Sequence, residues 1–242
     1  MTKTAIITGS NRGIGRAIAE RLAHDGMNVV LCARDADLLN QTAKAIGANT
    51  LTIPVDLRLP ESAAKVVDAA VARFSAVDVI VNNAGATKRG DFETLTDDDF
   101  IDGFALKYFA AVRMTRAAWP HLRKQKGSVI NIVGAGGRTP GAMFAIGGSV
   151  NAAVLSFTKA ISEKGIQDGV QVNAINPGPV RTARLAAQLK DVPEDEFLKQ
   201  HRIARIGEPA DIAAMVAFVL TPHGRLLQGS LIDMDGGSTK TI

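Results

Sequence analysis

The sequence predicts an α/β fold, a doubly wound parallel sheet of seven strands with helices packed on both of its faces. Apolar runs of strand length alternate with segments of helical period along the 242 residues, which is the pattern of such a sheet. The runs are continuously apolar instead of alternating, so we expect each strand to be buried on both faces, as parallel strands are.

The predicted strands and helices follow one another regularly along the chain. Thr96 with Asp99, and Pro209 with Asp211, are helix-start signals for the two helices that follow them. The predicted strands span residues 5–8, 28–32, 50–55, 77–81, 128–133, 170–175 and 231–234. The predicted helices span residues 13–26, 36–46, 60–74, 97–124, 149–165 and 209–220.

Size and composition indicate one domain over residues 1–242. Nothing in the chain resembles a linker, and a hydrophobic content of 46% suits a well-buried core. Residues 182–205 are polar, mixed and aperiodic, and they follow the sixth predicted strand, where doubly wound folds place ligands. We therefore expect this segment to be mobile and to lie on the substrate side of a binding site.

Charge and targeting patterns exclude several classes of function. The net charge is +4, but the basic residues are scattered, so we expect neither nucleic-acid binding nor more than a weak attraction for anions. The first predicted strand begins too early for a secretory signal, and no apolar run reaches membrane-spanning length. The single cysteine, Cys32, is expected to be a small buried hydrophobe. These features predict a cytoplasmic protein with no membrane partner, and we name no metal ligands.

Three glycines follow the first predicted strand directly and open the first predicted helix. In that context Gly9 allows a tight turn, Gly13 lets backbone approach a pyrophosphate, and Gly15 allows close packing of the helix. The helix N-terminus then faces the phosphates. The alternative is a tight turn that binds nothing, but the context favours a Rossmann-type dinucleotide site.

Further motifs make the whole chain resemble the short-chain dehydrogenase/reductase family. They are Asn-Asn-Ala-Gly at 82–85, Asp-Leu at 56–57, Pro-Gly-Pro-Val-Arg-Thr at 177–182, Arg-Ile-Gly-Glu-Pro at 205–209 and Asp-Gly-Gly at 235–237. The resemblance implies an oxidoreductase that acts on a carbonyl or alcohol substrate with a nicotinamide dinucleotide. The cofactor-binding residues that it implies, together with those of the glycine motif, are Gly9, Asn11, Arg12, Gly13, Ile14, Gly15, Arg34, Asp56, Leu57, Asn83, Ala84, Gly85, Asn151, Pro177, Gly178, Val180 and Thr182.

The end of the second predicted strand favours NADP(H) over NAD(H). A carboxylate there would bond a free ribose 2′-hydroxyl, but the sequence has Ala33 followed by Arg34. Arg12 lies in the glycine motif. Two guanidinium groups would pair well with a 2′-phosphate, although either arginine could instead be solvated.

The groups that the resemblance implies for proton transfer are missing. In the family a tyrosine exchanges the substrate proton, a following lysine lowers its pKa, a preceding serine orients the carbonyl, and an asparagine in the preceding helix completes the group. An ungapped match places Gly147, Asn151, Gly134 and Lys107 at these four positions, respectively. The only tyrosine, Tyr108, lies in the predicted helix 97–124, where we expect core or interface packing, so misalignment does not explain the loss.

Lys107 is the leading replacement for the missing proton donor. A lysine desolvated at the asparagine position would have a lowered pKa and act as an acid or an imine-forming amine. The alternative is a lysine that reaches solvent or caps a carbonyl. Ser149 or Thr139 could supply a hydroxyl, although local bonding to the backbone is the stronger reading of both residues.

A group of glycines surrounds the expected substrate position, so we expect a wide pocket or mobile walls, with room for a bulky ligand where the tyrosine would stand. The alternative is relaxed constraint on a site that is no longer used. These glycines are Gly134, Gly136, Gly137, Gly141, Gly147 and Gly148.

Three functions remain open. The first is an NADP(H)-dependent oxidoreductase that acts on an unknown small molecule with an unusual proton donor. The second is a catalytically silent dinucleotide-binding sensor or partner subunit, and the third is a non-redox lyase or isomerase. The resemblance also implies a homodimer or homotetramer in which helices 97–124 and 149–165 pair between subunits.

Overall fold

The computed structural model describes residues 2–47, 49–190 and 192–240, and its centre is a sheet of seven parallel strands. The strand order β3-β2-β1-β4-β5-β6-β7 reverses direction between β1 and β4, which makes the sheet doubly wound, as predicted. The strands are β1 Thr4–Thr8, β2 Asn28–Ala33, β3 Thr50–Pro54, β4 Val79–Asn82, β5 Ser128–Ile132, β6 Gln171–Pro177 and β7 Leu231–Met234.

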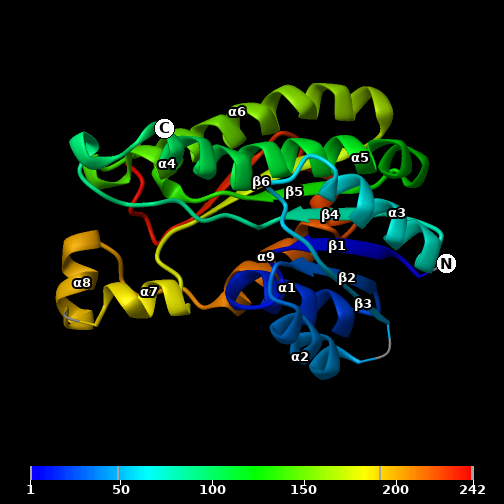
Figure 1. The fold of residues 1–242 in the computed structure, drawn as a ribbon, viewed down its shortest axis with the longest axis horizontal. Coiled ribbons are helices and arrows are strands. Elements are labelled where there is room, and N and C mark those ends of the chain that lie inside the picture. The colour runs from blue at the N-terminus through cyan, green and yellow to red at the C-terminus, as the bar shows by residue number, and fades with distance from the viewer. Residues whose placement is uncertain (1, 48, 191, 241–242) are drawn as a thin grey trace.

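Two layers of helices cover the sheet (Figure 1). The α1, α2 and α9 side chains share one buried cluster, and those of α3 and α5 share the cluster on the other face. The α6 helix packs along β6 beside them. The helices of the two layers are α1 Gly13–His24, α2 Ala36–Ile46, α3 Ser62–Phe74, α4 Asp97–Gly103, α5 Ala110–Gln125, α6 Ala145–Asp168 and α9 Pro209–Val219.

The central strands are buried on both faces, which confirms the prediction from their continuous hydrophobicity. Every residue of β1, β4, β5 and β6 is buried. The edge strands β3 and β7 keep partial exposure. The predicted helix starts are also present as capping boxes, Thr96 with Asp99 before α4 and Glu208 with Asp211 before α9.

The helix predicted over residues 97–124 is divided into three parts. Between α4 and α5, residues Phe104–Phe109 form a π-helical segment, η2. A π-turn inserts an extra residue into the helical repeat and changes the direction of the side chains around it, and such turns are frequent at functional sites. Lys107 lies inside this segment. The hydrophobic period on either side does not reveal the interruption.

Residues 182–205 contain two short helices, α7 Ala183–Gln188 and α8 Glu194–His201. Figure 1 shows them at the end of the molecule opposite the N-terminus, next to the carboxyl ends of the strands. The segment has a small apolar cluster of its own, with Leu185, Phe197 and Ile203 buried. The sequence indicated no helices here, because neither helix is long enough to show a hydrophobic period.

Residues Ala142–Asp168 form a helix that is long and apolar enough to cross a membrane by length and composition. The expectation that no segment reaches this length was therefore wrong. Ile146, Val150 and Val154 of this helix are buried inside the protein. Core helices of this kind pass the same test, so the length alone assigns no membrane role.

Cys32 is fully buried in the second strand, as predicted. Its backbone N–H donates to Ser10 Oγ at 3.1 Å, and its carbonyl accepts from the Gly9 N–H at 2.8 Å. Burial raises the pKa of its thiol to about 12. The residue therefore packs as a small apolar side chain and fixes the start of the loop that follows β1.

Candidate functional site

The loop between β1 and α1 is closed tightly around its glycines. Gly9 has a φ of +65°, and a side chain there would meet the Ala84 Cα at 3.0 Å. A Cβ on Gly15 would overlap the Gly9 carbonyl and the Asn83 amide, and one on Gly13 would touch Thr182 at 3.3 Å. The structure thus brings together the glycine motif, the loop after β4 and the loop after β6, which are the three segments that the sequence assigned to a cofactor.

The loop after β4 is fixed to this turn by hydrogen bonds from β1. The Thr8 hydroxyl accepts from the N–H groups of Asn83 and Ala84, both at 2.9 Å. The Asn83 amide donates to the Thr8 carbonyl at 2.9 Å and to the Gly9 carbonyl at 3.1 Å. The two loops therefore form one rigid wall across the point where the strand order reverses.

The N-terminus of α1 is open to an anion. Arg12 stands at its N-cap with no side-chain capping bond, and the first turn carries no acidic residue. The backbone N–H groups of a first helical turn need partners, and together with the helix dipole they favour a phosphate. Arg12 and Arg34 are both exposed. The β2 strand ends at Ala33, so Arg34 is the first residue after it, and the next residue, Asp35, accepts from the Leu38 N–H as the N-cap of α2.

The remaining predicted cofactor residues line the same edge of the sheet. The Asp56 carboxylate accepts from Arg58, which also pairs with Asp102. Leu57 is buried beneath the loop. At the end of β6, the Gly178 N–H donates to the Met234 carbonyl at 3.0 Å, and any side chain on Gly178 would press on the backbone of the loop that follows β7.

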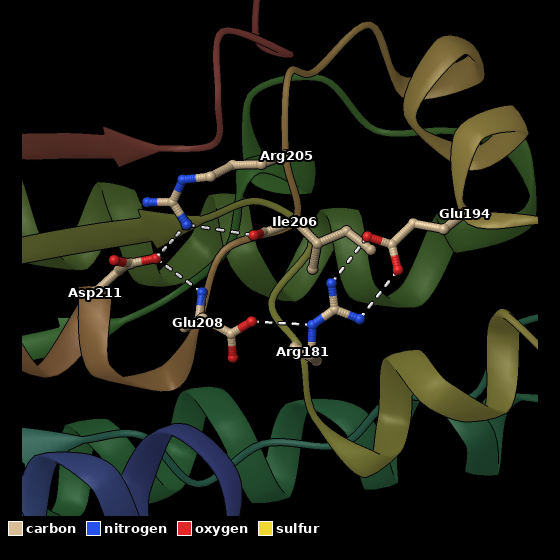
Figure 2. A network of polar contacts seen from close by, with 6 residues as sticks. All are labelled: Arg181, Glu194, Arg205, Ile206, Glu208 and Asp211. Carbon is tan, nitrogen blue, oxygen red and sulfur yellow. Dashed lines mark hydrogen bonds and ion pairs between the residues drawn. The ribbon is translucent and has the colours of Figure 1, made fainter.

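A network of ion pairs joins the two ends of the α7–α8 segment to the start of α9 (Figure 2). Arg181 binds Glu194 through two nitrogens at 2.9 and 3.1 Å, and it binds Glu208 at 2.9 Å. Arg205 binds Asp211 at 2.7 Å. The pairs are exposed to solvent, which screens them, so each contributes little to stability. Their effect is to fix where α7 begins, next to the glycine loop.

The two glycine positions expected to carry serine and tyrosine have changed in different ways. Gly134 has a φ of +135°, a conformation that other residues rarely adopt, so a serine there would be strained. At Gly147 the space for a side chain is filled by the ring of Phe144, which also contacts Gly136. The room for a bulky ligand that was expected at the tyrosine position is therefore absent, because the chain fills that space with its own aromatic ring, whereas the alternative of mobile walls stays a prediction.

Asn151, at the expected lysine position, lies under the loop after β5. It is 3% exposed and lies against Gly134 and Gly137. No side-chain hydrogen bond joins it to the part of the chain that the structure describes. Its amide is shorter than the lysine that the resemblance implies, so any ribose contact from this position is weaker in charge and in reach.

Lys107 extends from the π-helical segment to the carboxyl ends of β4 and β5, the edge of the sheet where the predicted cofactor segments meet. Its Nζ donates to the Val133 carbonyl at 2.5 Å, and its methylene groups pack against the Cα of Gly85. Burial and, to a smaller extent, the charge of Arg184 together lower the pKa of Lys107 to about 7. Both readings of this residue therefore have support, because it bonds a carbonyl and also has the lowered pKa of a proton donor.

The other candidate donors are bonded locally, exposed or packed against aromatic rings. The Thr139 hydroxyl donates weakly to the Ala135 carbonyl at 3.5 Å, which is the local backbone bond weighed above. Ser149 is exposed on α6. Tyr108 packs edge-on against Phe104, Phe109 and Phe157, so it serves packing, as expected.

Two arginines that the sequence did not mark also lie at this edge of the sheet. Arg184 Nη2 donates to the Gly85 carbonyl at 2.7 Å, and the Arg89 guanidinium lies over the Phe144 ring, 4.1 Å from its centroid. Arg89 lies in the loop after β4 and Arg184 in the short helix α7 after β6, and neither belongs to a motif that the sequence marks. Only the folded loops bring them together.

The chain matches known proteins over nearly its whole length. A family model described as enoyl-(acyl carrier protein) reductase matches residues 9–239. An uncharacterized oxidoreductase of Mycobacterium tuberculosis (strain CDC 1551 / Oshkosh) is 34% identical over 98% of this chain and 92% of its own length. A 3-oxoacyl-(acyl-carrier-protein) reductase FabG of Vibrio cholerae is 31% identical over 97% of this chain and 96% of its own length.

Solved structures agree with this assignment. L-sorbose reductase from Gluconobacter frateurii, complexed with NADPH and L-sorbose, has a TM-score of 0.94 at 31% identity over 100% of this chain and 98% of its own. A 3-ketoacyl-(acyl-carrier-protein) reductase from Brucella melitensis, complexed with NADH, has a TM-score of 0.89 at 28% identity over 98% of both chains.

With the fold, the glycine loop and these matches in place, the chain belongs to the short-chain dehydrogenase/reductase family. Its class is that of oxidoreductases with a nicotinamide dinucleotide cofactor, as predicted from the motifs. The relatives bind either form of the nucleotide, so family membership leaves the choice between NADP(H) and NAD(H) open.

Proposed function

We propose that this protein is an NADP(H)-dependent oxidoreductase of a carbonyl or alcohol substrate, in which Lys107 takes the place of the missing tyrosine as proton donor. The observation that carries the proposal is the position of the Lys107 ammonium. It lies between the ends of β4 and β5 with a pKa lowered to about 7, beside the loop where the family's catalytic groups would stand.

The loop after β1 and the start of α1 would suit a bound dinucleotide. The glycines of the first loop stand where side chains would overlap neighbouring backbone, and the first turn of α1 offers uncapped N–H groups to a pyrophosphate. Arg12 and Arg34 would hold a 2′-phosphate, and the first acidic residue after β2, Asp35, is engaged in capping α2. This supports a preference for NADP(H) over NAD(H).

In the proposed reaction the bound nicotinamide supplies or accepts the hydride. Lys107 donates a proton from Nζ to the oxygen that becomes the alcohol, and the neutral amine regains a proton from solvent. A pKa near 7 suits both steps at neutral pH. Val133 positions the ammonium through its carbonyl, and the Gly85 backbone limits its movement.

A catalytically silent dinucleotide-binding protein is the second candidate. Phe144 occupies the tyrosine position and Gly134 has a backbone conformation unsuited to serine, so restoring single residues would not restore the usual site. The bond from Lys107 to a carbonyl also favours this candidate, since a proton donor should be free to reach the substrate.

Binding and turnover separate the two candidates. NADPH and NADH are titrated by fluorescence, and NADPH oxidation is then assayed with a panel of ketones and quinones. The proposal expects tighter binding of NADPH and turnover that falls by about 100-fold or more in Lys107→Ala. Lys159→Ala, an exposed lysine on α6, is the matched control.

Tight binding without turnover on the panel would favour the silent protein. Retained turnover in Lys107→Ala would remove the role of that residue. Failure to bind either nucleotide would contradict both candidates.

We further propose that residues 1–242 act as one domain in the cytoplasm, with residues 182–205 moving when substrate binds. A homodimer or homotetramer that pairs α4, α5 and α6 between subunits is supported by the exposed apolar side chains of Ile101 and Phe109 along these helices. Sedimentation at micromolar concentration tests the assembly, and a monomer would contradict it.

A further inference from the structure

Arg184 lies near two other positive charges, Arg12 and Arg89, at the carboxyl edge of the sheet. Its guanidinium bonds the Gly85 carbonyl, and Arg12 on one side and Arg89 on the other are close enough to repel it. Arg12 belongs to the glycine loop, whereas Arg89 lies beside Phe144. Positive charge therefore extends from the glycine loop, where the phosphates would bind, to Phe144, beside the expected tyrosine position.

These arginines have no acidic partners. Within the residues that the structure describes, no carboxylate forms an ion pair with Arg12, Arg89 or Arg184. Partial burial, followed by the charges of Arg12 and Arg89, lowers the pKa of Arg184 below its usual range, and burial lowers that of Arg89. Arg58, Arg181 and Arg205, in contrast, all pair with carboxylates.

The position of Arg89 is built by two contacts. Its guanidinium stacks on the Phe144 ring, and the adjacent Gly90 N–H donates to the Met143 carbonyl at 3.3 Å, which joins the loop after β4 to the segment before α6. A guanidinium over a ring face still has N–H groups to offer a planar oxyanion. Arg89 lies beside the expected tyrosine position, because the same Phe144 ring covers Gly147.

We propose that Arg89 and Arg184 bind the carboxylate of the substrate, and that the substrate is an oxo acid or the corresponding hydroxy acid. Gly85 contacts Arg184 through its carbonyl and Lys107 through its Cα. Gly85 therefore lies between the anion site and the proposed proton donor. This short separation favours a substrate whose carboxylate is close to the reacting carbonyl, as in a 2-oxo acid. This inference rests on the proposed function for its reaction, but not for its binding.

The test compares benzoylformate with its methyl ester, which keeps the phenyl and 2-oxo groups but replaces the negative charge of the carboxylate with a methyl ester. Their dissociation constants are measured by calorimetry with the protein saturated with NADP+, and again without nucleotide, so that a result is obtained even if NADP+ does not bind. We expect the acid to bind about 10-fold or more tightly than the ester, because charge-assisted bidentate bonds form only with the acid.

The variants are Arg89→Gln and Arg184→Gln. Each substitution is expected to weaken binding of the acid by about 10-fold and to leave the affinity for the ester unchanged. The matched control is Arg73→Gln, since Arg73 also stacks on a phenylalanine, Phe74, at 4.9 Å, but on α3. Thermal melting checks that each variant stays folded.

Equal affinity for the acid and the ester would overturn the proposal. Variants that weaken NADP+ binding and leave the acid unchanged would also overturn it, because the arginines would then belong to the cofactor. Since binding is measured without turnover, a protein that prefers the acid but reduces nothing would support this site while contradicting the proposed function.

Discussion

The glycine loop after β1 and the segment from Gly134 to Asn151 both follow strands at the carboxyl edge of the sheet, but they are constrained in different ways. Around Gly9 and Gly15 the neighbours are backbone atoms and a hydrogen-bonded asparagine, none of which can move without disturbing β1 or β4. Around Gly147 the neighbour is the Phe144 ring, which can rotate or be replaced. The space around Gly9 and Gly15 is limited by the backbone of the fold, whereas the space around Gly147 is limited by a single side chain.

The glycine loop can therefore stay constant while the residue types between Gly134 and Asn151 differ from those that the family resemblance implies. The sheet and the glycine loop share their packing, so a change in one costs stability in the other. The segment after β5 rests on an aromatic ring and an exposed arginine, so its chemistry can change at little cost to the fold.

The strongest test of the comparison is Gly15→Ala. Its Cβ would overlap the Gly9 carbonyl and the Asn83 amide, so the loop must open. We expect dinucleotide affinity to fall by about 100-fold and stability by about 1 to 3 kcal/mol. Fluorescence titration and urea denaturation measure the two effects.

Gly141→Ala is the control, since Gly141 has open space around it and ordinary backbone angles. Equal effects of the two substitutions would show that the glycine loop is no more constrained than the segment before α6.

The second test addresses the occupied tyrosine position. Gly147→Tyr should destabilise the protein by about 1 to 3 kcal/mol, because its side chain meets the Phe144 ring. Adding Phe144→Ala should recover about 1 kcal/mol or more in a double-mutant cycle, measured by urea denaturation. If the two changes are simply additive, Phe144 is not what fills the space.

The third test uses the pH dependence of stability. The pKa of Lys107 is lowered to about 7 in the folded protein, below its unfolded value, so the unfolded chain binds more protons above pH 7. Wild type should therefore gain stability relative to Lys107→Met as pH rises, by about 1 to 2 kcal/mol between pH 7 and pH 9. Urea midpoints across this range measure the gain, and parallel curves would show that the lysine is solvated.

The smallest expected effect is at Cys32. With its thiol buried and its pKa raised to about 12, the native protein should show no reaction with a disulfide reagent at pH 8. The urea-unfolded chain, which exposes the same single thiol, provides the positive control. Rapid labelling of the native protein would mean that β2 opens readily next to the glycine loop.

Most of the fold was predictable because its signals are local and repeated. Continuous apolar runs located all seven strands to within two residues at each end, and the capping residues Thr96 and Glu208 mark the starts of α4 and α9. Two features had no such signal. The π-helical turn around Lys107 leaves the hydrophobic period intact, and α7 and α8 are too short to show one.

The candidate site divides in the same way. The glycine motif and the residues after β4 and β6 could be assigned from the sequence, because each motif directly follows a strand and the strands end at one edge. The roles of Phe144, Arg89 and Arg184 could not, since each depends on how an irregular loop folds back onto another segment. Nothing in their spacing indicates that they meet.

The sequence by itself determined the doubly wound sheet and the glycine loop after β1, because these depend on residue type and on spacing along one segment. Only the tertiary structure decided what surrounds Gly147 and Lys107. The ring of Phe144 fills the space at Gly147, and Lys107 and Arg184 both contact Gly85. Such contacts join residues far apart in the chain, and their geometry is set by packing.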